Sequence, residues 1–577
     1  MTRYWITVVT LYVGSIAACT PAAKEPAAEK PAAEATIPEN LDLVILNGRA
    51  MDPETELDAV RNVGIKDGKI VVVTAQTIEG AETIDAKDLV VAPGFIDTHY
   101  HAVDVFATKM ALRDGVTTGM DLEAGSFKVK EWYDEKAKTG WQVNYGTAAS
   151  LLFVRMAVHD LEVGLDVPID MSTIRPFIAK AAADGLQGWA ETRSSIEDMN
   201  QIIQVLDEDL RQGALGVAAP TAYMANGVTS YELFAAQRAG ANYGRLTSSH
   251  TRYHLLSDTP TEAPIAFDEI FTNAMLLNAP LIMCHNNDYG WWEIEEKLQL
   301  ARAKGLNMWS EYYPYAAGST AITAAFLRPS EWVEKRGYRY EDTIYDPIDD
   351  AYLTNETYAA LMKKEPGRSV VVEFPYRKPW MNNWLAIPHM TIASDSMVGV
   401  GADGESLPWD ADWTEYRGHP RTPGTRGKAF RMAREQGVPL MFTIAQASYW
   451  AAKHLGDTGL EAMQDRGRLQ VGKIADITIF DPETITDNSG FKVGEHGIPT
   501  TGIPYVVVNG TIVVKDSEVL PVKPGQPIRF PVEPKGKFQP IEVGTWLNEH
   551  TIGLNPDLAT IDVHDDSGAG SQLHGDN

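Results

Sequence analysis

The sequence predicts an α/β protein: a (β/α)8 TIM barrel with a small β-sandwich formed from both ends of the chain. Three observations carry this prediction. Short apolar runs alternate with helical stretches in the middle of the chain, β-rich segments occur at its two ends, and polar side chains stand where the apolar runs finish. Parallel strands joined by crossover helices produce such an alternation, and eight strands favour a closed barrel over an open sheet.

The eight apolar runs are short and rich in Val, Leu, Ile and Ala. We expect them as barrel strands at residues 90–96, 117–122, 145–149, 214–218, 245–249, 280–284, 306–310 and 390–394. Functional groups of such barrels lie at the carboxyl ends of the strands. A site is therefore expected directly after these runs.

The ends of the chain contain β-rich runs broken by Asn-Gly and Asp-Gly pairs, which favour hairpins. We expect residues 41–92 and 467–530 to form the composite β-sandwich and residues 93–466 to form the barrel. The barrel contains an insert at 321–389, and residues 531–577 form a C-terminal extension. A segment of the insert's length over a barrel mouth is typical of a lid, although its tryptophans could equally serve packing.

The first 19 residues resemble an export signal. Arg3 precedes an uncharged, largely apolar stretch that is too short to span a bilayer, and residues 16–19 (IAAC) resemble a bacterial lipobox. Cys19 is then the lipid acceptor, and plain secretory cleavage after Ala18 is the alternative. Residues 20–40, built of Ala, Pro, Glu and Lys, are expected to form an extended tether. These features predict a lipoprotein anchored to a membrane, in the periplasm or outer membrane of a Gram-negative bacterium.

Composition limits the possible partners. The formal net charge of -28 over 577 residues argues against nucleic-acid binding, which needs clustered Lys and Arg. Membrane contact is expected only through the anchor. Of the two cysteines, Cys19 would carry the lipid and Cys284 would stay unpaired, so a disulfide framework is not expected.

Histidines and carboxylates follow five of the eight predicted strands. In an extended segment alternate side chains point the same way, so His99 and His101 should project together. Each residue alone has a structural explanation, such as a helix cap or a core histidine. Their joint occurrence at strand ends that face one mouth favours a divalent metal site. The candidates are His99 and His101 (first strand), Glu123 (second), His250 (fifth), His285 (sixth) and Asp395 (eighth).

With these residues in place, the chain resembles the amidohydrolase superfamily over roughly residues 41–529. It is most similar to the N-acyl-D-amino-acid deacylases, and particularly to their D-glutamate deacylase branch. The segments that carry the resemblance are PGFIDTHYH (93–101), GVTT (115–118), GALG (213–216), HTRY (250–253), YPYAAGST (313–320), SD (394–395), HPR (419–421) and GRLQVGKIAD (467–476).

The resemblance implies hydrolysis of the amide bond of a small N-acyl-D-amino acid, possibly N-acyl-D-glutamate, with one or two Zn²⁺ ions. The implied metal ligands are His99, His101, Glu123, His250 and His285, and Asp395 would move protons. D-aminoacylases carry a cysteine where this chain has Glu123, and the D-glutamate branch has the DLEAG form found here.

The resemblance also implies residues that hold the substrate. They are Tyr223, Tyr313, Ser319 and Arg421, together with Arg252, which could replace a lysine that the family often has at the position of Asn287. Arg377 and Lys378 of the insert are further cations. Two alternatives stay open: another amidohydrolase activity, such as a dipeptidase or cyclic amidase, and a catalytically inactive surface binding protein.

Overall fold

The computed structural model describes residues 37–182, 187–252 and 262–551, and from Pro38 onward these residues belong to one compact unit. The predicted signal segment with Cys19, the tether as far as residue 36 and the end of the C-terminal extension lie outside the described residues. Within them, every helix is too short or too polar to cross a membrane.

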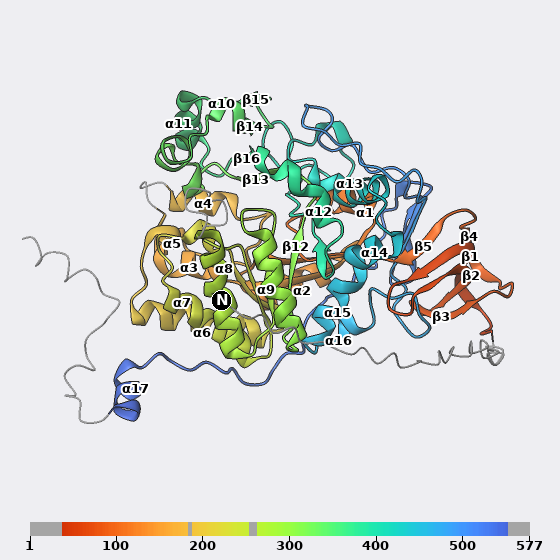
Figure 1. Ribbon diagram of the computed structural model, residues 1–577, viewed down its shortest axis with the longest axis horizontal. Helices are drawn as coiled ribbons and strands as arrows, with labels where there is room; N and C mark the ends of the chain where they lie inside the picture. Colours follow the sequence, from red (N-terminus) through yellow and green to blue (C-terminus); the bar gives the residue numbers. More distant parts are fainter. Residues whose placement is uncertain (1–36, 183–186, 253–261, 552–577) are drawn as a thin grey trace, which may run out of the picture. The chain divides into compact units, whose positions relative to one another are not determined.

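Eight parallel strands form a nearly closed barrel, which confirms the predicted fold class (Figure 1). Every predicted run contributes a strand, with bounds that differ from the expected ones by a few residues. The strands are β6 (Phe95–Asp97), β7 (Val116–Ser126), β8 (Asn144–Ser150), β9 (Gly216–Ala219), β10 (Leu246–Ser249), β11 (Leu281–Met283), β12 (Met308–Tyr312) and β17 (Met390–Ile392).

The first predicted run, residues 90–96, is not one barrel strand. Its first half, β5 (Val90–Pro93), pairs with β1 (Leu41–Asp52) and β18 (Ile477–Phe480) in a different sheet, and only β6 enters the barrel. The break lies at Pro93-Gly94, where proline has no N–H and the N–H of Gly94 donates to the carbonyl of Asp476 at 2.8 Å. A Cβ at Gly94 would lie 2.3 Å from the Thr117 hydroxyl, so the close approach to β7 requires glycine.

The barrel is closed between β17 and β6 mainly by side chains, since these two strands are the ends of the hydrogen-bonded order. Asp97 Oδ1 accepts from the N–H of Ser394 at 3.1 Å, and Asp97 Oδ2 accepts from the Ser394 hydroxyl at 2.5 Å. The Arg426 guanidinium donates to Oδ2 at 2.7 Å. All three residues are buried. We call this cluster of Asp97, Ser394 and Arg426 the closing cluster.

Helices surround the barrel and bury their apolar faces against it. The start of α6 (Ile196–Arg211) is fixed by a capping box formed by the side chains of Ser195 and Asp198. The surrounding helices are α1 (Val105–Arg113), α2 (Val129–Thr139), α3 (Leu151–His159), α4 (Arg175–Ala181), α5 (Gly188–Glu191), α6 (Ile196–Arg211), α7 (Ser230–Asn242), α8 (Glu262–Leu277), α9 (Trp291–Ala303), α13 (Arg421–Glu435), α14 (Leu440–Ile444), α15 (Trp450–Asp457) and α16 (Glu461–Gln464), with short turns η1 (Leu161–Val163), η2 (Thr221–Met224), η6 (Trp413–Glu415) and η7 (Ala445–Tyr449).

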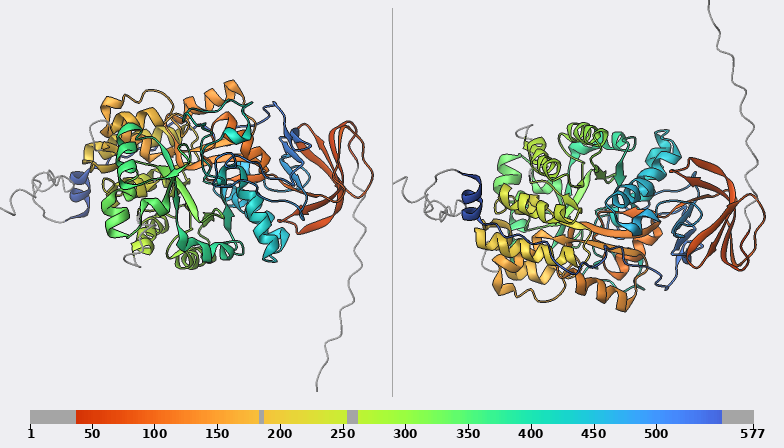
Figure 2. Two further views of the ribbon diagram at one scale, coloured as in Figure 1. Left: turned by 90° about the horizontal axis from the view of Figure 1, so that it is seen from above. Right: turned by 90° about the horizontal axis from the view of Figure 1, so that it is seen from below.

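A second sheet joins strands from both ends of the chain, as predicted. Figure 2 shows the N-terminal strands in red beside the C-terminal strands in blue. β5 and β18 form the junction, because they pair antiparallel from Val90 with Phe480 to Pro93 with Ile477. The strands are β1 (Leu41–Asp52), β2 (Leu57–Lys66), β3 (Lys69–Thr74), β4 (Gly80–Asp85), β5, β18 (Ile477–Phe480), β19 (Tyr505–Val508), β20 (Thr511–Lys515) and β21 (Glu518–Val519).

The insert between β12 and β17 forms a small four-stranded sheet of its own, with helices packed beside it (Figure 1). The sheet begins at Ala317, four residues before the expected start of the insert. Its elements are β13 (Ala317–Ala321), β14 (Ile344–Asp346), β15 (Ala351–Tyr352) and β16 (Ser369–Glu373), with α10 (Tyr340–Thr343), α11 (Asn355–Lys364), α12 (Met381–Trp384), η3 (Ala325–Leu327), η4 (Ser330–Lys335) and η5 (Pro375–Trp380).

The chain after β21 returns to the barrel. The N–H of Ile528 donates to the carbonyl of Tyr145 at 2.7 Å, and the N–H of Phe530 donates to the carbonyl of Gly213 at 3.1 Å. These contacts lie beside the amino ends of β8 and β9, opposite the end expected to carry the site. Residues 524–530, which we expected in the sandwich, therefore lie along the barrel. The described chain ends with α17 (Val543–His550).

Candidate metal centre

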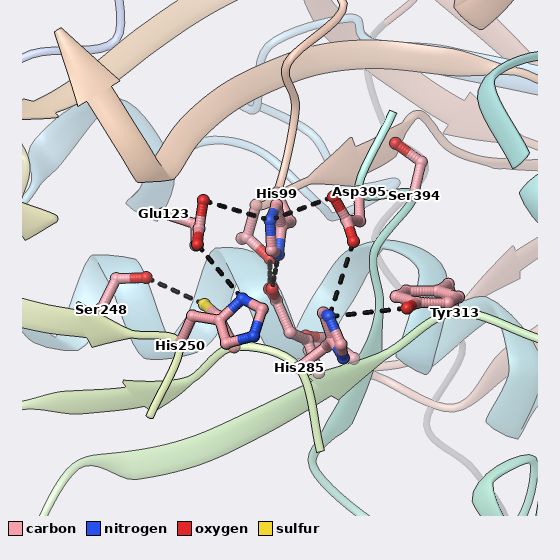
Figure 3. A network of polar contacts seen from close by, with 12 residues as sticks. His99, Glu123, Ser248, His250, His285, Tyr313, Ser394 and Asp395 are labelled. Carbon is pink, nitrogen blue, oxygen red and sulfur yellow. Dashed lines mark hydrogen bonds and ion pairs between the residues drawn. The ribbon is translucent and has the colours of Figure 1, made fainter. Parts of the chain in front are cut away.

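The histidines and carboxylates predicted at the strand ends meet at one end of the barrel. His99 and His101 follow β6, Glu123 lies within β7, and His250 and His285 follow β10 and β11. Figure 3 shows His99 between Glu123 and Asp395, with His250 on the Glu123 side and His285 on the Asp395 side. All six side chains are nearly inaccessible to solvent, and Asp395, at 8% exposure, is the most accessible.

The distances between these side chains fit one shared ion. His99 Nε2 lies 3.7 Å from Glu123 Oε2 and 3.4 Å from Asp395 Oδ1, and His101 Nε2 lies 3.5 Å from each of the same oxygens. Contacts of this length are weak as hydrogen bonds. Ligands at the usual 2.0–2.1 Å from a tetrahedral Zn²⁺ stand roughly 3.4 Å apart, so these four atoms have the spacing of a metal site.

The remaining two histidines extend this arrangement. His250 Nδ1 lies 3.4 Å from Glu123 Oε1, and His285 Nε2 lies 3.5 Å from Asp395 Oδ2. Each carboxylate therefore has one oxygen toward the His99–His101 pair and the other toward His250 or His285. This geometry suits carboxylates that serve one ion or bridge two.

Two carboxylates behind His99 and His101, the histidines that follow β6, orient these side chains. His99 Nδ1 lies 2.6 Å from Glu311 Oε1, and His101 Nδ1 lies 2.9 Å from Asp121 Oδ2. A carboxylate only accepts, so each Nδ1–H donates and each Nε2 presents its lone pair to the centre. The Thr98 hydroxyl donates to the other oxygen of Glu311 at 2.6 Å. Sequence reasoning missed Glu311 and Asp121, although Glu311 directly follows the predicted run 306–310 and was a usable signal.

The electrostatics of the site also favour a cation. Burial lowers the pKa of His99, but Asp395 and Glu311 outweigh it and raise this pKa well above its usual value. Burial likewise works against an ionised Glu123, yet its contacts with His250 and His99 hold the pKa of this carboxyl well below its usual range. With Asp121, these residues bring four buried carboxylates to one place, and buried negative charge needs a compensating positive charge.

Asp395 occupies an unusual position after β17. Its backbone is in the left-handed region with φ of 48°, which L-residues adopt at a cost and which clusters at functional sites. The neighbouring Ser394, two residues after the end of β17, is fixed by its hydrogen bonds to Asp97 in the closing cluster. The Asp395 carboxylate lies 2.8 Å from Arg421 Nη2, so one oxygen faces both the guanidinium and the histidines.

Four of the five predicted substrate residues line the cavity beside the metal ligands. They are Tyr223, Tyr313, Ser319 and Arg421. Arg421 is fully buried, its contact with Asp395 lacks hydrogen-bond geometry, and none of its guanidinium nitrogens has a hydrogen-bond partner within the described part of the chain. A buried guanidinium with unused donors is suited to a ligand carboxylate.

The structure does not bring Arg252 to this group. Its guanidinium donates to both carboxylate oxygens of Glu269, at 2.8 and 3.1 Å, and to two backbone carbonyls. Arg377 is similarly paired with Asp288, at 2.7 Å through two nitrogens, but its third nitrogen donates to the Tyr313 hydroxyl at 2.8 Å. Arg377 therefore reaches the site through Tyr313.

Sequence comparison identifies relatives that span most of the chain, although no family model matches it. The chain is 26% identical over 506 residues to an N-acyl-D-glutamate deacylase of Alcaligenes xylosoxydans xylosoxydans, and the alignment covers 82% of this chain and 94% of the relative. It is 25% identical over 514 residues to a D-aminoacylase of the same organism, covering 81% and 93%. A dihydroorotase of Streptococcus pneumoniae is 57% identical, but over 60 residues, 10% of this chain and 14% of the relative.

Structural comparison confirms the fold. An N-acyl-D-glutamate deacylase of Bordetella bronchiseptica, crystallised with zinc and a phosphonate inhibitor that mimics the tetrahedral intermediate, matches with a TM-score of 0.65. A D-aminoacylase described as defining a novel subset of amidohydrolases has the same score. Each match covers 85% of this chain and 100% of the other chain at 18% identity. A study of D-aminoacylase describes its binuclear metal centre. This chain is thus homologous to D-aminoacylases and N-acyl-D-glutamate deacylases and shares their fold.

Proposed function

We propose that this protein is a zinc-dependent hydrolase that cleaves N-acyl-D-amino acids into a D-amino acid and a carboxylic acid. The observation that carries the proposal is the spacing of 3.4 to 3.7 Å among His99 Nε2, His101 Nε2, Glu123 Oε2 and Asp395 Oδ1, which meet at the barrel end. The homology to D-aminoacylases supports the choice of substrate.

The ligand set divides the work among this chain's residues. His99, His101, Glu123, His250 and His285 would hold one or two ions, with Glu311 and Asp121 fixing two of the imidazoles. A bound divalent metal supplies a Lewis acid for the acyl carbonyl and lowers the pKa of an attacking water. The cavity that adjoins these ligands lies between the barrel helices and the insert and would hold the substrate.

Asp395 is the proton carrier in this proposal. Its carboxylate takes a proton from the attacking water as the new C–O bond forms, and it gives that proton to the amine nitrogen as the C–N bond breaks. Arg421 Nη2 lies 2.8 Å from this carboxylate, on the side that also faces the histidines. Arg421 also has unused donors for the substrate's α-carboxylate, and the Tyr313 hydroxyl is held in place by Arg377.

N-acyl-D-glutamate is the finer proposal for the substrate. The DLEAG form at Glu123 supports it, as does the homology to N-acyl-D-glutamate deacylase. A second substrate carboxylate needs a second cation besides Arg421. Arg377, which already faces Asp288, would be the cation nearest to Tyr313.

One observation favours a cyclic amidase as a second candidate: the short but strong identity to a dihydroorotase. The structural matches to hydantoinases, with TM-scores of 0.51 to 0.53, are weaker than those to D-aminoacylase. The side chains that line the described cavity include no lysine that could be carboxylated to bridge two metals. The deacylase proposal therefore ranks first.

The test is amine release by zinc-loaded protein from N-acetyl derivatives of D- and L-glutamate and D- and L-leucine, with dihydroorotate and a hydantoin in parallel. We expect turnover of the D-enantiomers and a loss of ~10² to 10⁴-fold in kcat for Asp395→Asn. Turnover of the cyclic amides alone would favour the second candidate. Preference for D-leucine over D-glutamate would reject the D-glutamate assignment and leave the deacylase proposal standing.

A further inference from the structure

The cavity at the metal centre has two arms of contrasting chemistry. The smaller arm is bordered by the hydroxyl and guanidinium groups of Tyr313, Arg377 and Arg421, beside the apolar Phe374. The larger arm, about 1080 Å³ including its open mouth, runs from the metal ligands between the barrel helices and the insert. Tyr223, His250, Ser319, Thr320 and Asp395 border both arms, so the arms meet at the reacting centre.

The larger arm has mainly apolar walls contributed by separate elements. Leu152 and Phe153 come from α3, Trp189 and Ala190 come from α5, and Ala324 comes from the insert. Apart from Leu152, which is half-buried, these residues expose less than a tenth of their surface, so the apolar walls belong to the interior of the protein.

The two arginines in the wall of the larger arm already have partners. Arg328 pairs with Glu191 at 2.6 Å, and the Arg175 guanidinium donates to the carbonyl of Gly404. The larger arm therefore offers a ligand mostly apolar surface, whereas the smaller arm offers the unused donors of Arg421.

We propose that the larger arm binds a long apolar acyl group, so that the substrates are fatty-acyl amino acids with acyl chains of about eight carbons or more. This inference rests on the proposed function. The carboxylate and the side chain of the substrate share the α-carbon, so a carboxylate on Arg421 keeps both near the smaller arm. The acyl chain leaves the scissile carbonyl in the other direction. An acetyl group would leave most of the apolar wall in contact with water.

The chain-length dependence of the holoenzyme tests this inference. Each methylene buried in an apolar site strengthens binding about three- to fourfold. From N-acetyl through N-butanoyl to N-octanoyl derivatives of one D-amino acid, we expect kcat/KM to rise at least about tenfold overall. A flat or falling profile would overturn the inference while the proposed function stands. Turnover of no N-acyl amino acid at any length would overturn the proposed function, and the inference with it.

Two variants separate the cavity wall from general effects on the protein. Leu152→Trp places a larger side chain in the wall, and we expect it to lower the ratio of octanoyl to acetyl kcat/KM by at least about fivefold. Leu161→Trp is the matched control, because Leu161 is 76% exposed and is not part of the wall. An unchanged ratio in Leu152→Trp would count against the inference.

A replacement variant and a second substrate series complete the test. If Leu152→Trp does not fold, Ala324→Leu, a smaller change in the same wall, replaces it with the same expectation. The second measurement is kcat/KM for N-acetyl-D-amino acids with progressively longer side chains, which tests whether the larger arm binds the side chain instead of the acyl group. A rise in kcat/KM in that series, with a flat acyl series, would show that the larger arm takes the side chain and would overturn the inference.

Discussion

Two buried carboxylates, Glu311 and Asp121, orient the two histidines that follow β6 toward the proposed metal. Each one accepts from an Nδ1–H and so turns the Nε2 of the same ring toward Glu123 and Asp395. Asp121 is itself held by the backbone N–H groups of Ala124 and Gly125, both at 2.9 Å. The centre therefore depends on residues that touch no substrate.

Glu311→Gln should weaken metal binding by about 10- to 100-fold, because the amide keeps the size of the side chain but loses the charge that orients His99. Isothermal titration of metal-free protein with Zn²⁺ measures the change. Glu295→Gln is the matched control, since Glu295 is equally buried but bonds to Ser310 and Asn286 outside the metal group. Wild-type affinity in Glu311→Gln would remove Glu311 from this role.

The residues at the strand ends were predictable because their position follows from strand direction alone. His99, His101, Glu123, His250, His285 and Asp395 stand where the barrel rule places functional groups. Arg252 shows the limit of this reasoning. Arg252 lies in the turn after β10 and its partner Glu269 lies on α8, and a pairing between a turn and a helix leaves no periodic signal in the sequence.

Among the elements, the contact between β6 and β17 is a vulnerable point of the barrel. Asp97 and Arg426 form an ion pair at 2.7 Å in the closing cluster, and both are fully buried. Asp97→Asn would leave the Arg426 charge without its counter-ion. Breaking a buried pair in this way costs about 3 to 5 kcal/mol.

We therefore expect Asp97→Asn to lower the thermal unfolding midpoint substantially. Asp58→Asn is the control variant, because Asp58 and its partner Arg49 are both exposed. Exposed ion pairs contribute about 0 to 1 kcal/mol to the free energy of unfolding. Calorimetry of both variants measures the difference. Equal midpoints for the two variants would show that the closing cluster does not stabilise the barrel.

The junction between α6 and α2 predicts a pH dependence of stability. Asp209 of α6 accepts from the N–H of Val129 at the start of α2, and burial raises the pKa of its carboxyl to about 7. The folded protein therefore keeps a proton that the unfolded chain releases above about pH 4. The contribution of this retained proton to the free energy of unfolding is at most about 4 kcal/mol. It is complete below pH 4 and is lost as the pH rises through 7.

Asp209→Asn removes this titration and keeps an oxygen acceptor for Val129. The thermal unfolding midpoint of the wild type, measured relative to that of this variant, should decrease as the pH rises from 5 to 8. Asp134→Asn, at an exposed carboxylate of α2, is the control and should follow the wild type. A constant difference between the wild type and Asp209→Asn over this range would contradict the assigned pKa.

The strands were predictable from apolar runs, and their exact partners were not. Residues 90–96 form one apolar run, but Pro93-Gly94 divides it between two sheets, because β18 from the far end of the chain supplies the partner for β5. The sheet of the insert begins at Ala317, before the predicted start of the insert at residue 321. Pairing over such sequence distances is fixed by packing, which single-sequence patterns do not encode.

At the scale of the whole molecule, the proposed lipid anchor determines where the enzyme works. Cys19→Ser should release the protein from the membrane fraction or leave an uncleaved precursor, because each buried lipid CH₂ contributes about 0.8 kcal/mol to anchoring. Immunoblots of fractionated cells measure this distribution. Cys284→Ser, at the buried second cysteine, should fractionate as the wild type does. A wild-type protein found in the soluble fraction would refute the lipobox interpretation.

The central claim is that the six residues at the strand ends form one metal-dependent hydrolytic centre. The most direct measurement is a titration of chelator-treated protein with Zn²⁺, in which bound metal and amine release from an N-acyl-D-amino acid are followed in the same samples. We expect almost no amine release without metal, and a rise in amine release that saturates at one or two equivalents of Zn²⁺. Full activity in the metal-free protein, or saturated metal without amine release from any N-acyl-D-amino acid, would contradict it.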